Sequence, residues 1–350
     1  MSFTHGGDWV GFYEKTGTLP MDFSANISPL GLPKGVREAV KQALDRADRY
    51  PDPFCRKLRE EIGRTFSVPP SWILCGNGAG DLIERLVQAV RPRQALVTAP
   101  TFSEYPAALL RIGCAVHEYP LGPENGFRLT DPFLQEITAE TDIVFLCEPN
   151  NPTGVTTEPD LLLEIMERCE RCGALLVVDE CFNALLSEPK KHTLLPYLAT
   201  HRLLILNAFT KSHGMAGLRL GFCLCRDMDL LEMVRQSGQP WPVSVVAQEA
   251  GIAALQDSKY PLRLRALLDR QRPVLRSGLA GLGAARIAGE ANYLLFHHAD
   301  LNLADKLVQK GVLIRRCDDY AGLGPGWYRV AIRGEEENQW LLQTIRQVIQ

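Results

Sequence analysis

The sequence contains no apolar run of roughly 18 or more residues, the length that a membrane-spanning helix needs. It also lacks a strong excess of either charge, because 38 Lys and Arg residues against 41 Asp and Glu residues give a formal net charge of −3. No broad positive field is therefore available for nucleic acid. The sequence also shows no signal-peptide pattern, no internal repeat and no low-complexity linker. We expect a cytoplasmic globular protein that binds neither membrane nor nucleic acid.

The ten cysteines do not form a recognisable metal module. Cys169 and Cys172 have C-x-x-C spacing but lie in a helix-like stretch, while Cys223 and Cys225 alternate along a strand-like stretch. A structural zinc site needs four convergent ligands, and these two pairs lack the spacing of known modules. We expect reduced, mostly buried thiols and no metal.

Length and periodicity predict an α/β fold. The 350 residues exceed an ordinary single domain, and 46% hydrophobic with 23% charged residues is typical of globular proteins. Strand and helix patterns alternate from about residue 72 to 225, which predicts a mainly parallel sheet with helices on both faces. The expected strands are 72–75, 94–98, 114–118, 143–147, 174–178, 203–207 and 219–225. The expected helices are 79–91, 104–112, 158–171 and 227–236.

The rest of the chain predicts a smaller α+β domain. After Pro240-Trp241-Pro242 we expect one long helix over 244–278. Strands near 292–297, 312–314 and 327–332 and a closing helix over 335–348 follow. We divide the chain into an amino-terminal arm with part of the small domain (1–45), a large domain (46–245) and a carboxy-terminal small domain (246–350).

The most informative residue is Lys211. It follows the apolar strand pattern 203–206, comes directly after Thr210, and precedes a Gly-rich segment that contains Arg219. A lysine at a strand end inside a core is costly unless its charge is neutralised or used. One use is a Schiff base with an aldehyde, and the hydroxyl and the arginine could hold a phosphate beside it. These features indicate pyridoxal 5'-phosphate (PLP). A lone Thr-Lys pair is more often a surface feature, so the interpretation needs the rest of a PLP site.

Three further motifs follow predicted strands in a consistent order. Asn150 and Asn151 follow the strand pattern 143–147, at the edge of the sheet where open α/β folds bind ligands. Asp179 ends a buried strand, where it could pair with a pyridine nitrogen or simply cap the next helix. Gly76-Asn77-Gly78 precedes a helix whose first backbone amides suit a phosphate.

This ordered set resembles the fold-type I, aspartate-aminotransferase-like PLP enzymes over essentially the whole chain. Within them it is most similar to the histidinol-phosphate aminotransferase branch, and closer still to the decarboxylases of L-threonine O-3-phosphate in cobalamin synthesis. The narrower resemblance rests on six segments. They are His5-Gly6-Gly7, 22–31, 49–52, 239–243, 291–295 and 328–333.

The resemblance implies a role for each cofactor residue. Lys211 would bind PLP covalently and later move protons, Asp179 would bond the pyridine nitrogen, Asn151 would donate to the phenolic oxygen, and Phe102 would stack on the ring. The groups that would hold the cofactor phosphate are the backbone of Gly78 and Ala79, the Thr210 hydroxyl, Arg219, and Tyr50 from a partner subunit. The last of these implies a homodimer with shared active sites.

The same resemblance, together with the positive charge of some side chains, indicates the substrate contacts. Arg329 would bind the substrate carboxylate through a two-pronged contact that lysine cannot copy. Asn26 lies in the loop that resembles the substrate-covering segment. His5, and Arg315 or Arg316, could add positive charge for a substrate phosphate. The alternative for His5 is a disordered terminal histidine. The alternative for the two arginines is that at least one is simply solvated, because neighbouring residues of a strand face opposite ways.

Two departures from the family pattern bear on the reaction. Ala208 stands where the family usually has Ser or Thr, so one phosphate hydroxyl is missing. Phe182 stands where the aminotransferases usually have a tyrosine, and the decarboxylases are similar in having phenylalanine. We therefore expect decarboxylation of L-threonine O-3-phosphate. The alternatives are decarboxylation of L-serine O-phosphate, a histidinol-phosphate-type aminotransferase, and a PLP-binding protein without catalysis.

Overall fold

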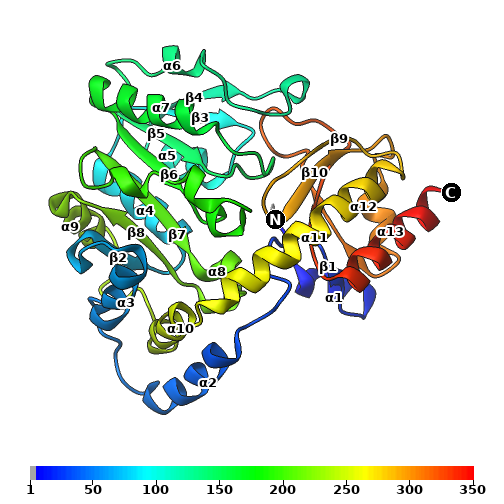
Figure 1. Ribbon diagram of the computed structural model, residues 1–350, viewed down its shortest axis with the longest axis horizontal. Helices are drawn as coiled ribbons and strands as arrows, with labels where there is room; N and C mark the ends of the chain where they lie inside the picture. The colour runs from blue at the N-terminus through cyan, green and yellow to red at the C-terminus, as the bar shows by residue number, and fades with distance from the viewer. Residues whose placement is uncertain (1–4) are drawn as a thin grey trace.

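A computed structural model describes residues 5–350 and has a large and a small α/β part (Figure 1). The first four residues of the predicted amino-terminal arm lie outside the described residues. The large part contains a seven-stranded sheet in which all strands are parallel except β8. Its order is β2 (Ile73–Gly76), β8 (Gly221–Cys225), β7 (Leu203–Ala208), β6 (Leu175–Asp179), β5 (Ile143–Cys147), β3 (Gln94–Ala99) and β4 (Ala115–Pro120). The α/β prediction with a mainly parallel sheet is confirmed.

Each face of this sheet carries its own buried core, because successive strand residues point to opposite faces. Val97, Phe145 and Val177 face one side, where α4 (Ala79–Val90), α5 (Glu104–Arg111) and α9 (Met228–Gln236) pack. Their neighbours Leu96 and Val144 face the other side. The helices there are α3 (Arg56–Phe66), α7 (Pro159–Cys172) and α10 (Val245–Gln256). Except for the edge strand β4, which is mostly exposed, the strands are largely buried, and this explains why they read as apolar runs.

The small part is built on an antiparallel sheet with its own core. Its order is β12 (Arg315–Arg316), β13 (Trp327–Ala331), β10 (Tyr293–His297) and β9 (Ala285–Ala288). The helices α11 (Lys259–Ala280), α12 (Leu303–Val308) and α13 (Glu335–Ile349) pack on it. Figure 1 shows α11 running from the large part to the small part.

The amino-terminal segment contacts both parts. α1 (Trp9–Thr16) precedes β1 (Met21–Asp22), which pairs in parallel with β11 (Val312–Leu313) of the small part. α2 (Lys34–Ala43) packs instead against α10. The remaining short helices are α6 (Phe133–Glu136) and α8 (Phe209–Ser212). Among residues 5–350, no helix is long and apolar enough to cross a membrane.

One prediction for the carboxy-terminal region was wrong. The expected helix over 244–278 is two helices, α10 and α11, with Asp257 and Ser258 between them. The Asp257 carboxylate accepts a hydrogen bond from the backbone N–H of Tyr260 at 3.1 Å, which satisfies a free donor at the start of a new helix. The strand expected over 312–314 is present as β11, and a separate strand, β12, follows it and pairs with β13. Strand β9 and helix α12 were not predicted.

Candidate active site

The predicted cofactor residues meet at the carboxyl ends of β5, β6 and β7. Cys147 pairs with Asp179 in the sheet register, and Asp179 pairs with Leu206, so Asp179 lies on the central strand of the three. Lys211 follows β7 in the short helix α8. Parallel strands end at a common edge, which is why segments far apart in the sequence converge here.

The buried Asp179 carboxylate has a donor on each oxygen. Oδ2 accepts a hydrogen bond from the Tyr105 hydroxyl at 2.7 Å, and Oδ1 accepts one from the backbone N–H of Cys181 at 3.0 Å. Asp179 is 4% exposed. A carboxylate at this depth needs such donors in place of the water that it loses on burial. Asp179 caps no following α-helix, so the capping alternative does not apply.

Lys211 is half-buried, with its Nζ atom 5.7 Å from the centre of the Phe182 ring. Burial and then the positive charge of Arg329 lower the pKa of its ammonium to about 8, well below the ordinary value of 10.5. A substantial fraction of the side chain is therefore a neutral amine near pH 8, the form that attacks an aldehyde.

The start of α4 forms a cradle for an anion. Gly78 has φ +84°, and a Cβ built on it would lie only 2.9 Å from Nη2 of Arg219. A Cβ on Gly221 of the neighbouring strand would lie 2.6 Å from the backbone nitrogen of Ala79. The Arg219 guanidinium and the first backbone amides of α4 therefore lie close together, at positions where a side chain larger than glycine would not fit. Thr210 lies in α8, next to Lys211.

A second polar group joins the small part to the large part. Arg329, on β13, donates from Nη1 to the side-chain oxygen of Asn151 and from Nη2 to the backbone oxygen of Ser24 at 3.1 Å. Arg329 is 5% exposed, and its Nε has no hydrogen-bond partner among the described residues. The buried Oδ1 of Asn26 also has none there. Buried polar atoms without protein partners fit a site that a polar ligand completes.

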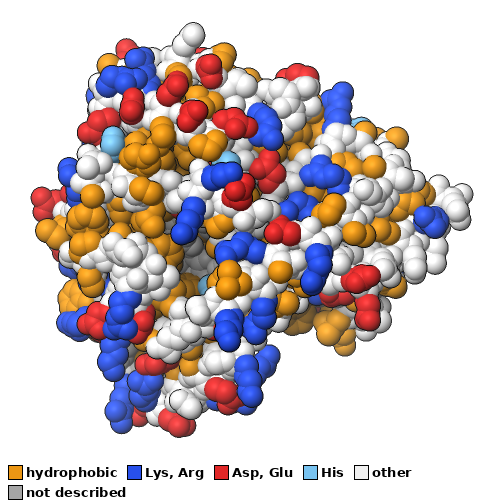
Figure 2. Space-filling view, viewed as in Figure 1, with side chains coloured by type: hydrophobic (Ala, Val, Ile, Leu, Met, Phe, Trp, Pro, Cys, Tyr) orange, Lys and Arg blue, Asp and Glu red, His pale blue; other side chains and the backbone are white. Residues whose placement is uncertain are grey.

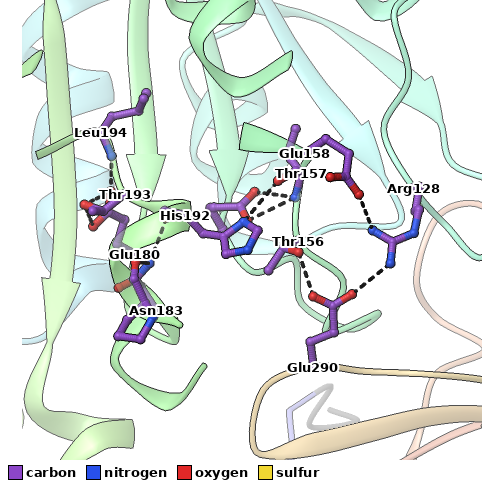
Figure 3. Close-up of polar contacts among 12 residues, drawn as sticks. Arg128, Thr156, Thr157, Glu158, Glu180, Asn183, His192, Thr193, Leu194 and Glu290 are labelled. Carbon is purple, nitrogen blue, oxygen red and sulfur yellow. Dashed lines mark hydrogen bonds and ion pairs between the residues drawn. The ribbon is translucent and has the colours of Figure 1, made fainter. Parts of the chain in front are cut away.

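The loop that carries Asn151 is held by several further contacts (Figure 3). The Glu290 carboxylate, from the loop before β10, accepts from the Thr156 hydroxyl at 2.6 Å and contacts Arg128 at 3.2 Å. The backbone N–H of Glu290 donates to the oxygen of Gly154 at 2.7 Å. Behind the loop, burial raises the pKa of Glu148 to about 8. Its two oxygens accept from the backbone N–H of Thr157 at 3.1 and 3.0 Å.

The remaining predicted residues occupy different surroundings. His5 lies near Phe102, with ring centres 6.1 Å apart, and its Nε2 is 2.9 Å from the Glu104 carboxylate. Tyr50 is 78% exposed and stacks on Trp241 at 4.3 Å, away from the group just described. The two arginines of β12 form ion pairs, Arg315 with Asp319 and Arg316 with Asp305 and Asp318.

Sequence reasoning missed three residues that hold the site together. They are Tyr105, Tyr293 and Glu290. The Tyr293 hydroxyl donates to the backbone oxygen of Asn150 at 2.8 Å, and its ring lies 5.4 Å from the Arg329 guanidinium. For Tyr105, the one local signal in the sequence is its position three residues after Phe102, the residue expected to stack on the cofactor. No local pattern indicates Tyr293 or Glu290.

Comparison with known proteins identifies the class. The model of the aminotransferase class I and II family matches residues 19–345, so the chain belongs to this family of PLP-dependent enzymes. The chain is 37% identical over 333 residues to the threonine-phosphate decarboxylase of Salmonella typhimurium, covering 94% of this chain and 91% of that protein. These findings confirm the resemblance and the cofactor predicted from the sequence.

Two other relatives lie on the aminotransferase side. Histidinol-phosphate aminotransferase 2 of Ralstonia nicotianae is 31% identical, covering 90% of this chain and 85% of that protein. The crystal structure of the histidinol-phosphate aminotransferase from Clostridium acetobutylicum has a TM-score of 0.87 at 24% identity, covering 93% of this chain and 98% of that one. At that identity the structural match shows the fold alone.

The residues present fit PLP. An amine of lowered pKa, a buried carboxylate on the neighbouring strand end and a glycine-lined anion cradle lie at one edge of the sheet. These are the groups that an aldehyde, a pyridine nitrogen and a phosphate require.

Proposed function

We propose that this protein removes the carboxylate of L-threonine O-3-phosphate as carbon dioxide and forms (R)-1-amino-2-propanol O-2-phosphate, for cobalamin side-chain synthesis in the cytoplasm. The observation that carries the proposal is the 37% identity to the Salmonella decarboxylase over nearly the whole chain. The buried Phe182 beside Lys211 supports it, because a phenylalanine cannot donate to the cofactor's phenolic oxygen as the aminotransferase tyrosine does.

The residues would share the chemistry as follows. Bound PLP accepts the electron pair that the breaking bond leaves at Cα. Asp179 holds the proton on the ring nitrogen, Arg329 orients the substrate carboxylate, and Asn151 donates to the cofactor's phenolic oxygen. Lys211, as an ammonium, would deliver a proton to Cα once carbon dioxide has left. Each turnover consumes one proton, which solvent would return to Lys211.

The outcome would depend on how Arg329 orients the substrate carboxylate. An orientation that keeps the carboxylate from leaving would favour loss of the Cα proton instead, and the amino group would then be transferred. The aminotransferase of histidinol-phosphate type is therefore the second candidate, and the Ralstonia relative favours it. L-serine O-phosphate is a second substrate candidate, because one methyl group changes binding by only about 1–3 kcal/mol.

We place His5 and Arg315 as contacts for the substrate phosphate. Arg315 has a buried Nε without a partner among residues 5–350, and the Asp319 carboxylate holds its Nη2 at 2.6 Å. Replacement of either residue would raise KM for L-threonine O-3-phosphate more than KM for L-threonine. An equal effect on both substrates would contradict the assignment.

We also propose a homodimer in which Tyr50 reaches the cofactor phosphate of the partner subunit. Tyr50, Phe54 and Trp241 are 78%, 41% and 42% exposed. On the face seen in Figure 2, hydrophobic side chains gather toward the side where α9 lies. Exposed aromatic side chains close together are typical of interaction sites. Sedimentation equilibrium measures the mass, and a monomer that binds PLP with full affinity would contradict the proposal.

The function is tested by product analysis of PLP-loaded protein with L-threonine O-3-phosphate, first alone and then with an α-keto acid. The decarboxylase forms carbon dioxide and aminopropanol phosphate without the keto acid. Amino transfer that requires the keto acid, with histidinol phosphate as donor, would establish the aminotransferase instead. Cofactor absorbance without either product would indicate a PLP-binding protein without catalysis, and Lys211→Ala should abolish that absorbance.

A further inference from the structure

Tyr105 contacts the proposed cofactor carboxylate from outside the strand-end motifs. It belongs to α5, on one face of the sheet, and its side chain is completely buried. Its hydroxyl donates to Oδ2 of Asp179 at 2.7 Å. Hydrogen bonds of this length to a carboxylate are roughly twice as strong as those between neutral groups.

The surrounding aromatic rings hold Tyr105 in one orientation. Its ring stacks on Phe145 at 5.1 Å with an interplanar angle of 16°. Its edge meets Phe102 at 5.5 Å and 81°. Phe102 is the residue expected to stack on the cofactor ring, so Tyr105 contacts both the predicted stacking residue and the predicted partner of the ring nitrogen.

The Tyr105 hydroxyl keeps its proton. Burial, and then the negative charge of Asp179, raise the pKa of the phenol well above its ordinary range. The phenol has one O–H donor, and Asp179 takes it. The other titratable groups around this pair include Cys147, Cys181, Lys211, Glu180 and Tyr293. The thiols of Cys147 and Cys181 also stay protonated, because burial raises the pKa of each.

A donor on one oxygen changes how the carboxylate acts on a shared proton. It draws negative charge toward Oδ2 and so makes the carboxylate a weaker base. A pyridine nitrogen hydrogen-bonded to the same carboxylate then keeps its proton, and the charged ring remains the stronger electron acceptor. Without the hydroxyl, the buried pair would favour its neutral form, because low-dielectric surroundings disfavour separated charges.

We propose that Tyr105 is a positioning residue that orients the Asp179 carboxylate and keeps the proton of the Asp179–pyridine pair on the cofactor nitrogen. This inference rests on the proposed cofactor site. It assigns a role to the hydroxyl alone, since the ring of Tyr105 would pack equally well without it.

The test compares Tyr105→Phe with the matched control Tyr328→Phe. Tyr328 is also buried and also donates from its hydroxyl, to the backbone oxygen of Asp300 at 2.9 Å in the small part. The measurements are equilibrium affinity for PLP and the pH dependence of the visible absorbance of the bound cofactor. For Tyr105→Phe we expect roughly 10- to 100-fold weaker PLP binding, as loss of a hydrogen bond to a charged group implies. The pH-dependent change in the visible absorbance should also move to higher pH, because a neutral ring makes the nitrogen of the Lys211–cofactor linkage more basic.

The outcomes separate the inference from the proposed function. If the unaltered protein binds no PLP, the cofactor site itself is wrong. If it binds PLP and Tyr105→Phe shows the same affinity and the same transition as Tyr328→Phe, the role of Tyr105 is overturned. If Tyr105→Phe does not fold, 3-fluorotyrosine at position 105 keeps the shape and makes the phenol a stronger donor. The transition should then move to lower pH, and an unmoved transition would contradict the inference.

Discussion

The guanidinium of Arg329 donates a hydrogen bond to the side-chain oxygen of Asn151, a residue 178 positions earlier in the chain. The two residues come from the small and the large part of the molecule. The Tyr293 hydroxyl reinforces the contact through the backbone oxygen of Asn150 at 2.8 Å. The proposed carboxylate-binding and cofactor-binding groups are therefore held in register by direct contact.

Removal of the Arg329 charge should change the reactivity of Lys211. Because a neighbouring cation disfavours the ammonium form, the Arg329→Gln variant should have a Lys211 pKa above about 8. The rate at which the cofactor-free protein captures PLP, measured against pH, should then reach its plateau at higher pH. Arg333→Gln is the control, since Arg333 pairs with Glu337 at 2.7 Å. Equal midpoints in both variants would contradict the explanation.

Phe182→Tyr should move the reaction toward amino transfer. Phe182 is buried, its ring meets the Tyr293 ring at 5.1 Å, and the Lys211 Nζ lies 5.7 Å from its centre, so a hydroxyl added to this ring would lie near the proposed cofactor site. We expect the ratio of transamination to decarboxylation to rise several-fold, together with a shift in cofactor absorbance. Product analysis by mass spectrometry measures the ratio. An unchanged ratio with a shifted spectrum would show that this position does not select the broken bond.

Glu290→Gln should loosen the junction between the two parts. The carboxylate contacts Thr156 and Arg128, and a partly exposed contact of this kind contributes about 0.5–1.5 kcal/mol. KM for the substrate should rise a few-fold because Arg329 is less firmly placed against Asn151, while PLP affinity stays unchanged. Glu158→Gln is the control, because Glu158 contacts the same Arg128 at 3.2 Å without bridging to the small part. An equal effect of both variants would contradict this role.

Glu148→Gln should change how stability depends on pH. Burial raises the pKa of Glu148 from its ordinary 4.5 to about 8, so the folded state holds this proton more tightly than the unfolded chain. The resulting stabilisation is fully present below about pH 4.5 and is lost as pH rises through 8. A glutamine does not titrate, so the variant does not lose this stabilisation as the pH rises. The difference in unfolding free energy, variant minus unaltered protein, should therefore increase by on the order of 1–3 kcal/mol between pH 6 and 9. Urea unfolding measures it, with the exposed Glu167→Gln as control. Parallel pH profiles would contradict the expectation.

Much of the large part could be predicted from local patterns. Most of its strands are apolar runs, with the exposed edge strand β4 as the exception, and the candidate residues Asn151, Asp179 and Lys211 lie at or shortly after the ends of β5, β6 and β7. The break between α10 and α11 was missed because the apolar periodicity continues across Asp257, whose capping role depends on backbone geometry. The short strands β1, β9 and β12 were not predicted, because strands of two to four residues are too short to show a periodicity.

The sequence by itself determined the fold class, the cofactor and the strand ends where the candidate cofactor residues lie. These features depend on residue type and on spacing along one element, which are local properties. Only the tertiary structure decided that Arg329 meets Asn151, that Tyr105 holds Asp179, and that Glu290 joins the two parts. Each of these contacts links elements that sequence spacing cannot align, because side-chain hydrogen bonds depend on atomic positions that packing alone establishes.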